Sequence, residues 1–257
     1  MSDIIVLMAS LTIGPFVERL CGGAICFETM SANLKNWIIL FAASAAFSPM
    51  AVALPNAAIT ELGGGLLVLP EDGLGLCWAI PLFVLAMELA DYGYHRAQHA
   101  WPFLWAMHSL HHSDPVLGIT TSIRHFWADP LIRMAVVYPP VMLLMRPSLS
   151  VLAVYNALLL WGHIDHLNVR LSFGRFWAFL TSPQYHRIHH AAADGIIDSN
   201  FAATLLFIDV IFGTCHKPKV GEFPASGLRE GRLPAGFLDL VFWPGRSKTA
   251  AGYGTIL

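Results

Sequence analysis

Charged residues are scarce in this chain of 257 residues: 12% are Asp, Glu, Lys or Arg, whereas 56% are hydrophobic. Ordinary soluble domains carry about 25% charged residues, so the deficit indicates a protein that lies in a lipid bilayer. A basic excess is also missing, because 15 Lys and Arg stand against 17 Asp and Glu. Nucleic-acid binding depends largely on such an excess, and the sequence therefore argues against a nucleic-acid partner.

A disulfide framework is absent as well. The four cysteines, Cys21, Cys26, Cys77 and Cys215, form no CxxC pair and no regular spacing, and disulfides belong to oxidising, secreted contexts. We therefore expect free thiols. The length predicts a single membrane domain over residues 1–257. Its catalytic core is expected at about 75–216, followed by a tail at about 218–257 that is rich in Gly and Pro and expected to be peripheral.

Long apolar runs predict an all-α integral membrane protein. Residues 36–60 hold no formal charge, which is long enough for one helix to cross the hydrocarbon core. A second run starts at Gly73 and ends near His95, and the runs 134–145 and 147–164 flank a tight turn. The pattern predicts about four transmembrane helices in two hairpins. Residues 4–17 are apolar but short, so an interfacial helix and a strained span both remain open.

The distribution of Lys and Arg predicts the orientation, because short loops rich in these residues stay in the cytoplasm. The connection 61–72 has three acidic residues and no Lys or Arg, whereas 95–133 and the region after 165 carry several arginines. The former is assigned outside and the latter two inside, with Arg146 as the exception. We expect an integral protein of a bacterial inner membrane with a helical cap on the cytoplasmic side.

Ten of the twelve histidines fall into four clusters, and residues three or four apart share one face of a helix. Two apolar runs end near the first and third clusters, so all four clusters are predicted on the cytoplasmic side. Ten imidazoles exceed the capacity of one metal ion, which favours two metals, and imidazole suits iron, zinc and copper. The clusters are His95 and His99; His108, His111 and His112; His163 and His166; and His186, His189 and His190.

Other interpretations of these histidines are less favoured. A lone HxxxH is most often a solvated or core helix face, but two HxxHH motifs beside two further pairs are not explained that way. The isolated His125 and His216 are assigned ordinary surface or hydrogen-bonded roles. A membrane zinc hydrolase would need the glutamate of HExxH, a bis-histidine haem protein for electron transfer would need single histidines on facing helices, and a metal transporter would hold its ligands near the midplane.

The region from about 88 to 216 resembles the fatty acid hydroxylase and sterol desaturase superfamily of integral-membrane di-iron enzymes. The most specific motif is Ser-Pro-Gln-Tyr-His-Arg-Ile-His-His at 182–190, which is followed by Asp198-Ser-Asn200-Phe and Phe212-Gly-Thr. His166-Leu-Asn168 is similar to the third histidine motif of the family. Within the superfamily the chain is most similar to the branch of alkylglycerol monooxygenases and bacterial sterol-desaturase-like proteins.

The resemblance implies that nine of the clustered histidines bind two iron ions, with zinc as a possible substitute in purified protein. His163 is the tenth expected ligand, although its spacing to His166 is three where some members have four. His125 is not counted, because Phe126 stands where many relatives have histidine. Neutral imidazoles leave the metal charge uncompensated, so carboxylates should orient the rings. The candidates are Glu88, Asp91, Asp165 and Asp198, the last of which also fits a helix N-cap; Asn200, Tyr94 and Tyr185 are implied as hydrogen-bonding groups.

The implied activity is O2-dependent hydroxylation or desaturation of a C–H bond in a lipid such as a fatty acyl chain, sterol, ether lipid or carotenoid. Iron would carry chemistry that side chains cannot perform. The sequence shows no glycine-rich dinucleotide fingerprint, so a separate electron-transfer protein is expected to supply electrons. The apolar substrate is expected to enter from the bilayer between the helices.

Overall fold

Two long apolar helices form the first hairpin of the computed structural model, which describes residues 8, 12–192, 196, 198–219 and 221–246. Helix α3 (Phe27–Glu61) and helix α4 (Leu76–Ala100), which follows the short η1 (Gly73–Gly75), are long and apolar enough to cross a bilayer. Much of the α3 surface is apolar and exposed, including Ile38, Met50 and Leu54. Helix α3 stays continuous through Pro49 and Pro55.

The second hairpin is shorter and consists of α6 (Asp129–Leu144), α7 (Leu149–Leu158) and the four-residue α8 (Trp161–Ile164). With 16 residues, α6 extends about 24 Å at 1.5 Å per residue, less than the roughly 30 Å hydrocarbon core. Helix α6 packs on α3 and α4, and α7 packs on α4. Their shared core includes an edge-to-face contact of Phe83 with Tyr155 at 5.5 Å between ring centroids.

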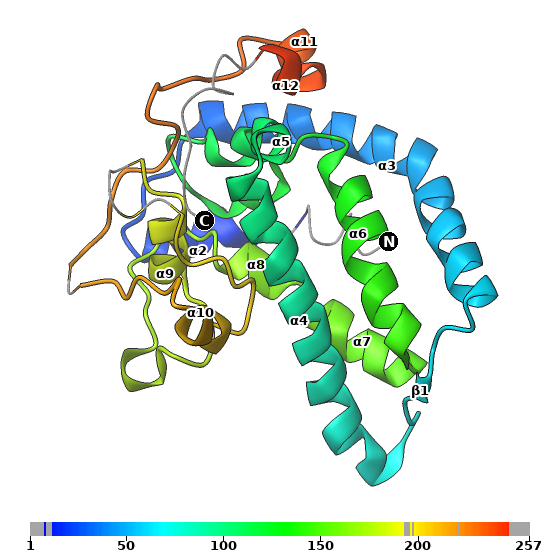
Figure 1. Cartoon of the computed structure of the whole chain (residues 1–257). Coiled ribbons are helices and arrows are strands. Elements are labelled where there is room, and N and C mark those ends of the chain that lie inside the picture. The colour runs from blue at the N-terminus through cyan, green and yellow to red at the C-terminus, as the bar shows by residue number, and fades with distance from the viewer. Residues whose placement is uncertain (1–7, 9–11, 193–195, 197, 220, 247–257) are drawn as a thin grey trace.

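The turns of both hairpins lie at the same end of the molecule, near the label β1 in Figure 1. Strand β1 (Leu67–Val68), between α3 and α4, pairs in parallel with β2 (Met145–Arg146), between α6 and α7. Ser148 strengthens this junction, because its hydroxyl donates to the Pro70 carbonyl at 2.7 Å and accepts from the Val151 amide at the start of α7. The predicted tight turn at 146–148 thus joins the two hairpins.

The histidine-bearing helices α5 (Pro102–His112) and α9 (Pro183–His189) lie at the opposite end of α4, beside its C-terminal turns (Figure 1). The short helices η2 (Ile119–Ile123), η3 (Gly174–Phe176) and α10 (Phe207–Phe212) belong to the same end. Proline occupies the first position of both α5 and α9, where its missing N–H costs no hydrogen bond. The first turns of α3 reach the same end, since the Asn33 amide donates to Asp114 at 2.8 Å.

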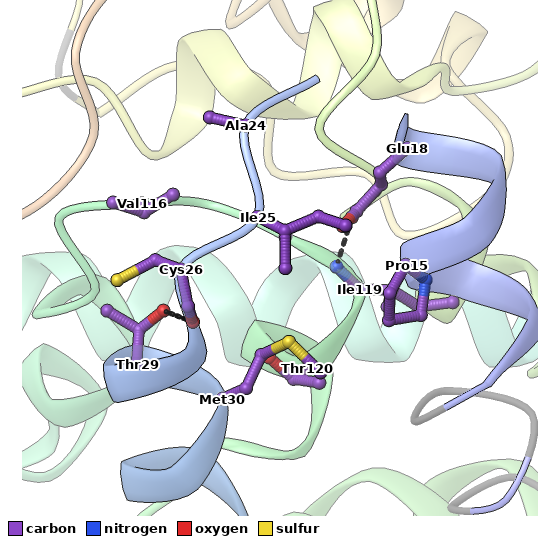
Figure 2. A pocket seen from close by; sticks show the side chains of 11 residues that line it. Pro15, Glu18, Ala24, Ile25, Cys26, Thr29, Met30, Val116, Ile119 and Thr120 are labelled. Carbon is purple, nitrogen blue, oxygen red and sulfur yellow. Dashed lines mark hydrogen bonds between the residues drawn. The ribbon is translucent and has the colours of Figure 1, made fainter. Parts of the chain in front are cut away.

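The N-terminal helix α2 (Ile13–Leu20) is anchored to this histidine-bearing end by one buried carboxylate. Glu18 Oε1 accepts from the amides of Ile119 at 2.8 Å and Asn168 at 3.0 Å, and Figure 2 shows the side chain directed at Ile119. Three apolar side chains of α2, spaced three and four residues apart, are exposed: Ile13, Phe16 and Leu20. Such an eight-residue amphipathic helix is too short to span a bilayer and is typical of an interfacial one; residues 4–7 and 9–11 lie outside the described part.

The tail was expected to be peripheral, but its described part packs directly against the histidine-bearing helices. Helices α11 (Phe237–Val241) and α12 (Trp243–Arg246) lie over α3 and α5 (Figure 1). The Trp243 side chain is completely buried, and its indole N–H donates to Ser109 Oγ in the last turn of α5 at 2.9 Å. The tail therefore helps to position the helix that carries HSLHH.

Candidate metal centre

Nine of the ten predicted histidine ligands come together in two groups. Within each group every imidazole offers one nitrogen atom, and these nitrogen atoms all lie within 4.8 Å of one another. Eight of the nine rings are buried, and His95 is half-buried. Helices α4, α5 and α9 and the segment after α8 supply them. The five-histidine group is His95, His99, His108, His112 and His189, and the four-histidine group is His111, His166, His186 and His190.

Hydrogen bonds to carbonyl groups fix the rings of the four-histidine group. The Nδ1 atom of His111 donates to the Arg124 carbonyl at 3.1 Å, and that of His166 donates to the Gly162 carbonyl at 2.5 Å. A carbonyl can only accept, so both neutral rings carry their proton on Nδ1 and present an unprotonated Nε2. These two Nε2 atoms lie 3.2 Å apart. Two lone pairs at that distance repel each other unless a cation lies between them.

Three residues of the segment 198–201 orient three rings of the five-histidine group. The Asp198 carboxylate accepts from His99 Nδ1 at 2.9 Å, the Ser199 carbonyl from His189 Nδ1 at 2.8 Å, and the Phe201 carbonyl from His95 Nδ1 at 2.8 Å. The facing Nε2 atoms of His99 and His189 are buried without a hydrogen-bond partner among the described residues.

The conformation of this segment requires particular residues. Asp198 and Asn200 have φ values of 64° and 61°, in the left-handed region that Asp and Asn adopt more readily than most residues. Among the described residues Asn200 forms no hydrogen bond with a histidine ring; its amide donates to the carbonyls of Tyr185 and His216, at 3.1 and 3.0 Å. Asp209 binds the amides of Phe201 and Ala202, at 2.9 and 2.7 Å. The segment is thereby held against α9.

The chemistry of both groups fits metal binding. Burial lowers the pKa of His111, His112, His186, His189 and His190 well below that of free histidine, and the neighbouring imidazoles lower it further. The rings are therefore neutral, the form that binds metal. The Nε2 atoms of neighbouring rings lie 3.1–3.2 Å apart, and two imidazole nitrogens on one metal at 2.0–2.1 Å are separated by about 2.8–3.4 Å. Two ions, one in each group, would satisfy the nine facing rings.

His163 lies outside both groups. Its Nδ1 is 2.6 Å from the Ser122 hydroxyl. His125, which was not counted as a ligand, is nearer to the centre than its isolated position in the sequence indicated, because its ring stacks on His111 at 4.4 Å between centroids. His216 lies 3.5 Å from Glu222 and belongs to neither group.

Only one of the four candidate carboxylates contacts a ring of either group, namely Asp198. Glu88 accepts from the amides of Thr204 and Leu205, Asp91 pairs with Arg133 at 2.6 Å, and Asp165 accepts from the Thr181 hydroxyl. Backbone carbonyls orient four of the other eight rings, those of His95, His111, His166 and His189. The expectation that carboxylates orient the rings therefore holds for the five-histidine group through Asp198, whereas Glu88, Asp91 and Asp165 stabilise the surrounding backbone and helices.

Two buried aspartates were missed in the sequence. Asp129 accepts from Tyr94 at 2.9 Å and from Gln98 at 2.6 Å, and its second oxygen lies 3.7 Å from His108 Nδ1. Asp209 accepts from the Tyr185 hydroxyl at 3.1 Å in addition to its two amide contacts. Asp129 follows shortly after His125 and Phe126, the two residues of this stretch that the motif comparison considered. Asp209 lies in an apolar run, where an uncompensated charge was the available signal.

Residues 80–214, which contain both histidine groups and the segment 198–201, match the family model described as fatty acid hydroxylase. The chain belongs to the fatty acid hydroxylase family. The resemblance to this superfamily seen in the motifs is thereby confirmed. No solved structure matches the chain.

Known relatives in this family act on lipids, as their names state. The chain is 31% identical to the alkylglycerol monooxygenase of Xenopus tropicalis over 151 residues, which cover 58% of this chain and 32% of the relative. It is 29% identical to the ornithine lipid hydroxylase OlsE of Rhizobium tropici over 164 residues, which cover 63% of this chain and 49% of the relative. The aligned region thus spans about a third to a half of these relatives.

Proposed function

We propose that this chain is a membrane-bound di-iron oxygenase that hydroxylates a C–H bond of a lipid, using O2 and electrons from a separate protein. The observation that carries the proposal is the convergence of nine neutral imidazoles in two groups, each close enough to surround one ion. The Nε2 atoms of His111 and His166, whose protons lie on Nδ1 beside carbonyl groups, are 3.2 Å apart and repel each other unless a cation lies between them. The family and the lipid-modifying relatives support iron and a lipid substrate.

The ligands proposed for one iron are the five-histidine group, and those for the other iron are the four-histidine group. Bound iron would supply the activation of dioxygen and the oxidising power that side chains lack. The protein's own contribution is to hold the imidazoles neutral and correctly turned. Asp198 and the carbonyls of Ser199 and Phe201 do this on one side, and the carbonyls of Arg124 and Gly162 on the other. Asn200 acts indirectly, because it fixes the segment that carries Asp198.

We further propose that both hairpins enter the bilayer from the cytoplasmic side and that the histidine-bearing end forms a cap there. The turns of both hairpins lie together at the end of the molecule that is far from the histidines. The turn between α3 and α4, residues 61–72, carries no Lys or Arg, whereas the turn between α6 and α7 carries Arg146 as the exception. Helices α6 and α7 are short for a full crossing, so local thinning or tilting of neighbouring helices would accompany the second hairpin. A bacterial inner membrane is the proposed location.

The substrate proposed is a lipid whose chain enters laterally between the apolar helices and whose polar group stays near the cap. Because α4 carries His95 and His99 on its last turns, directly after its apolar part, the iron site would lie close to the membrane surface. A chain lying along α4 would present carbons near its polar end to the site.

Metal content and oxygen chemistry of the purified full chain test the proposal. We expect two iron ions per chain, oxygen consumption in the presence of a reductant and lipid, and no haem band in the optical spectrum. Lipid analysis of cells with and without the gene product should show a hydroxylated lipid that depends on the chain. One metal per chain without oxygen consumption would refute the di-iron assignment, and a Soret band would establish haem.

A further inference from the structure

A cavity that is separate from the two histidine groups lies on the outer side of the histidine-bearing segments. Its volume is about 450 Å³, which falls in the range of small-molecule sites. The loop after α2, the segment 168–170, helix α9 and the tail segment 223–226 line it. The two cationic side chains in its lining are Arg170 and Arg187, and its lining contains no acidic residue.

Arg187 is built into the wall of this cavity. It lies on α9 between the ligands His186 and His189, but its side chain extends to the opposite side and is only 6% exposed. One terminal nitrogen donates to Asn168 Oδ1 at 2.6 Å and the other to the Pro224 carbonyl at 3.2 Å. Its Nε is buried and has no hydrogen-bond partner among the described residues. A buried donor without an acceptor is costly unless a ligand supplies one.

Arg170 places a second positive charge beside the first. The ring of Phe223 contacts both guanidinium groups, at 4.3 Å for Arg170 and 3.8 Å for Arg187. Arg170 is exposed and is held by a hydrogen bond to the Gly221 carbonyl at 3.0 Å. Two guanidinium groups on one phenyl ring repel each other, and an anion in the cavity would relieve that repulsion.

No carboxylate of the described chain forms an ion pair with either arginine. Glu18 is the nearby acid and attracts Arg187 through space without forming an ion pair. Its Oε1 accepts from the amides of Asn168 and of Ile119, the second of which Figure 2 shows. Glu222, next to Phe223 in the chain, accepts from the Lys219 amide and lies 3.5 Å from His216. The nearby acidic groups therefore offset the positive charge of the cavity only in part, because neither arginine has a carboxylate partner in direct contact.

From this arrangement we propose that the cavity is an oxyanion site, in which the guanidinium groups of Arg170 and Arg187 bind a phosphate group. Paired guanidinium groups suit phosphate, because their N–H donors match its oxygens. The phosphate has two possible sources, a phospholipid headgroup or free inorganic phosphate. The loop Cys21–Ala24 that lines the cavity directly follows α2 with its exposed apolar face, so a headgroup at the membrane surface is within reach of the site.

The test is a titration of the purified full chain in detergent, with the rise in Tm converted to an apparent Kd. The ligands are inorganic phosphate, short-chain phosphatidylglycerol and, for ionic strength, chloride. The variants are Arg170→Gln and Arg187→Gln. The matched control is Arg175→Gln, because Arg175 is also an exposed arginine stacked on a phenylalanine, Phe176, but does not line the cavity.

We expect the loss of either guanidinium in the cavity to weaken phosphate binding about 10-fold or more, while Arg175→Gln stays within about twofold of the wild type. If the Arg187 variant does not fold, Arg170→Gln decides alone, since its side chain is exposed. Tighter binding of phosphatidylglycerol than of phosphate assigns the site to lipid headgroups, and equal or weaker binding assigns it to soluble phosphate. Absence of a response above chloride, or an Arg170 variant equal to the wild type, would overturn the proposal.

Discussion

Replacing Asp198 by Asn should weaken one of the two proposed metal sites and spare the other. Asp198 Oδ1 accepts from His99 Nδ1 at 2.9 Å, and His99 belongs to the five-histidine group. Asn adopts the positive φ of this position as readily as Asp and keeps an oxygen that can accept the same hydrogen bond. The substitution therefore removes the negative charge with little change in the backbone.

The expected magnitude follows from the role of such a carboxylate. Removing a group that orients and polarises a ligand typically costs 10–100-fold in metal affinity, or about 1.4–2.7 kcal/mol. The carboxylate side chain is 26% exposed, which favours the lower half of that range because water screens the charge. The four-histidine group is oriented by the carbonyls of Arg124 and Gly162 instead, so its affinity should be unchanged.

The assay is metal analysis of the purified protein after equilibration with a chelator at increasing concentrations. The wild type should lose its two ions over one range, whereas Asp198→Asn should lose the first ion at a chelator concentration about 10-fold lower and keep the second. The control is Asp72→Asn, which changes an exposed aspartate directly before η1 in the turn between α3 and α4, and it should match the wild type. Two ions retained as tightly as in the wild type, or both weakened equally, would refute the reasoning.

Four further predictions test the site and the fold. Replacing His189 by Ala should abolish product while the protein still inserts into membranes, and full activity with two bound metals would contradict its role as a ligand. His163→Ala should keep both metals because that ring lies outside both groups; loss of a metal from the purified variant would restore it as the tenth ligand. Trp243→Ala, which empties a completely buried site against α5, should cost about 3–5 kcal/mol in denaturant unfolding, and a cost near zero would show that the tail is dispensable. Burial raises the pKa of Glu18, so the folded state binds more protons than the unfolded state above about pH 4.5 and stability should fall as pH rises through that window. Glu18→Gln, which keeps the accepting oxygen, should flatten this fall when Tm is measured from pH 4 to 7, and an unchanged slope would contradict it.

The sequence by itself determined the helical class, the family and the histidines that make up the proposed metal site. Helical spacing places histidines three and four residues apart on one face, and apolar runs of sufficient length predict spanning helices whatever their neighbours. Both properties are local, so the positions of His95 and His99 at the end of α4 and of three histidines on α5 followed from the order of residues. The histidine motifs, above all the one at 182–190, then identified the family.

Tertiary structure decided how those histidines are divided and oriented. The split into groups of five and four depends on how α4, α5 and α9 cross, which no local pattern specifies; α5 itself contributes to both groups through His108 and His111. The groups that orient the rings are mostly backbone carbonyls, which every residue possesses and no residue type reveals. Asp129 and Asp209 bind partners 31 residues away or across a loop, and the separation of His163 from both groups accompanies its contact with Ser122. Such long-range contacts are set by the packing of the whole chain and not by the spacing of residues along it.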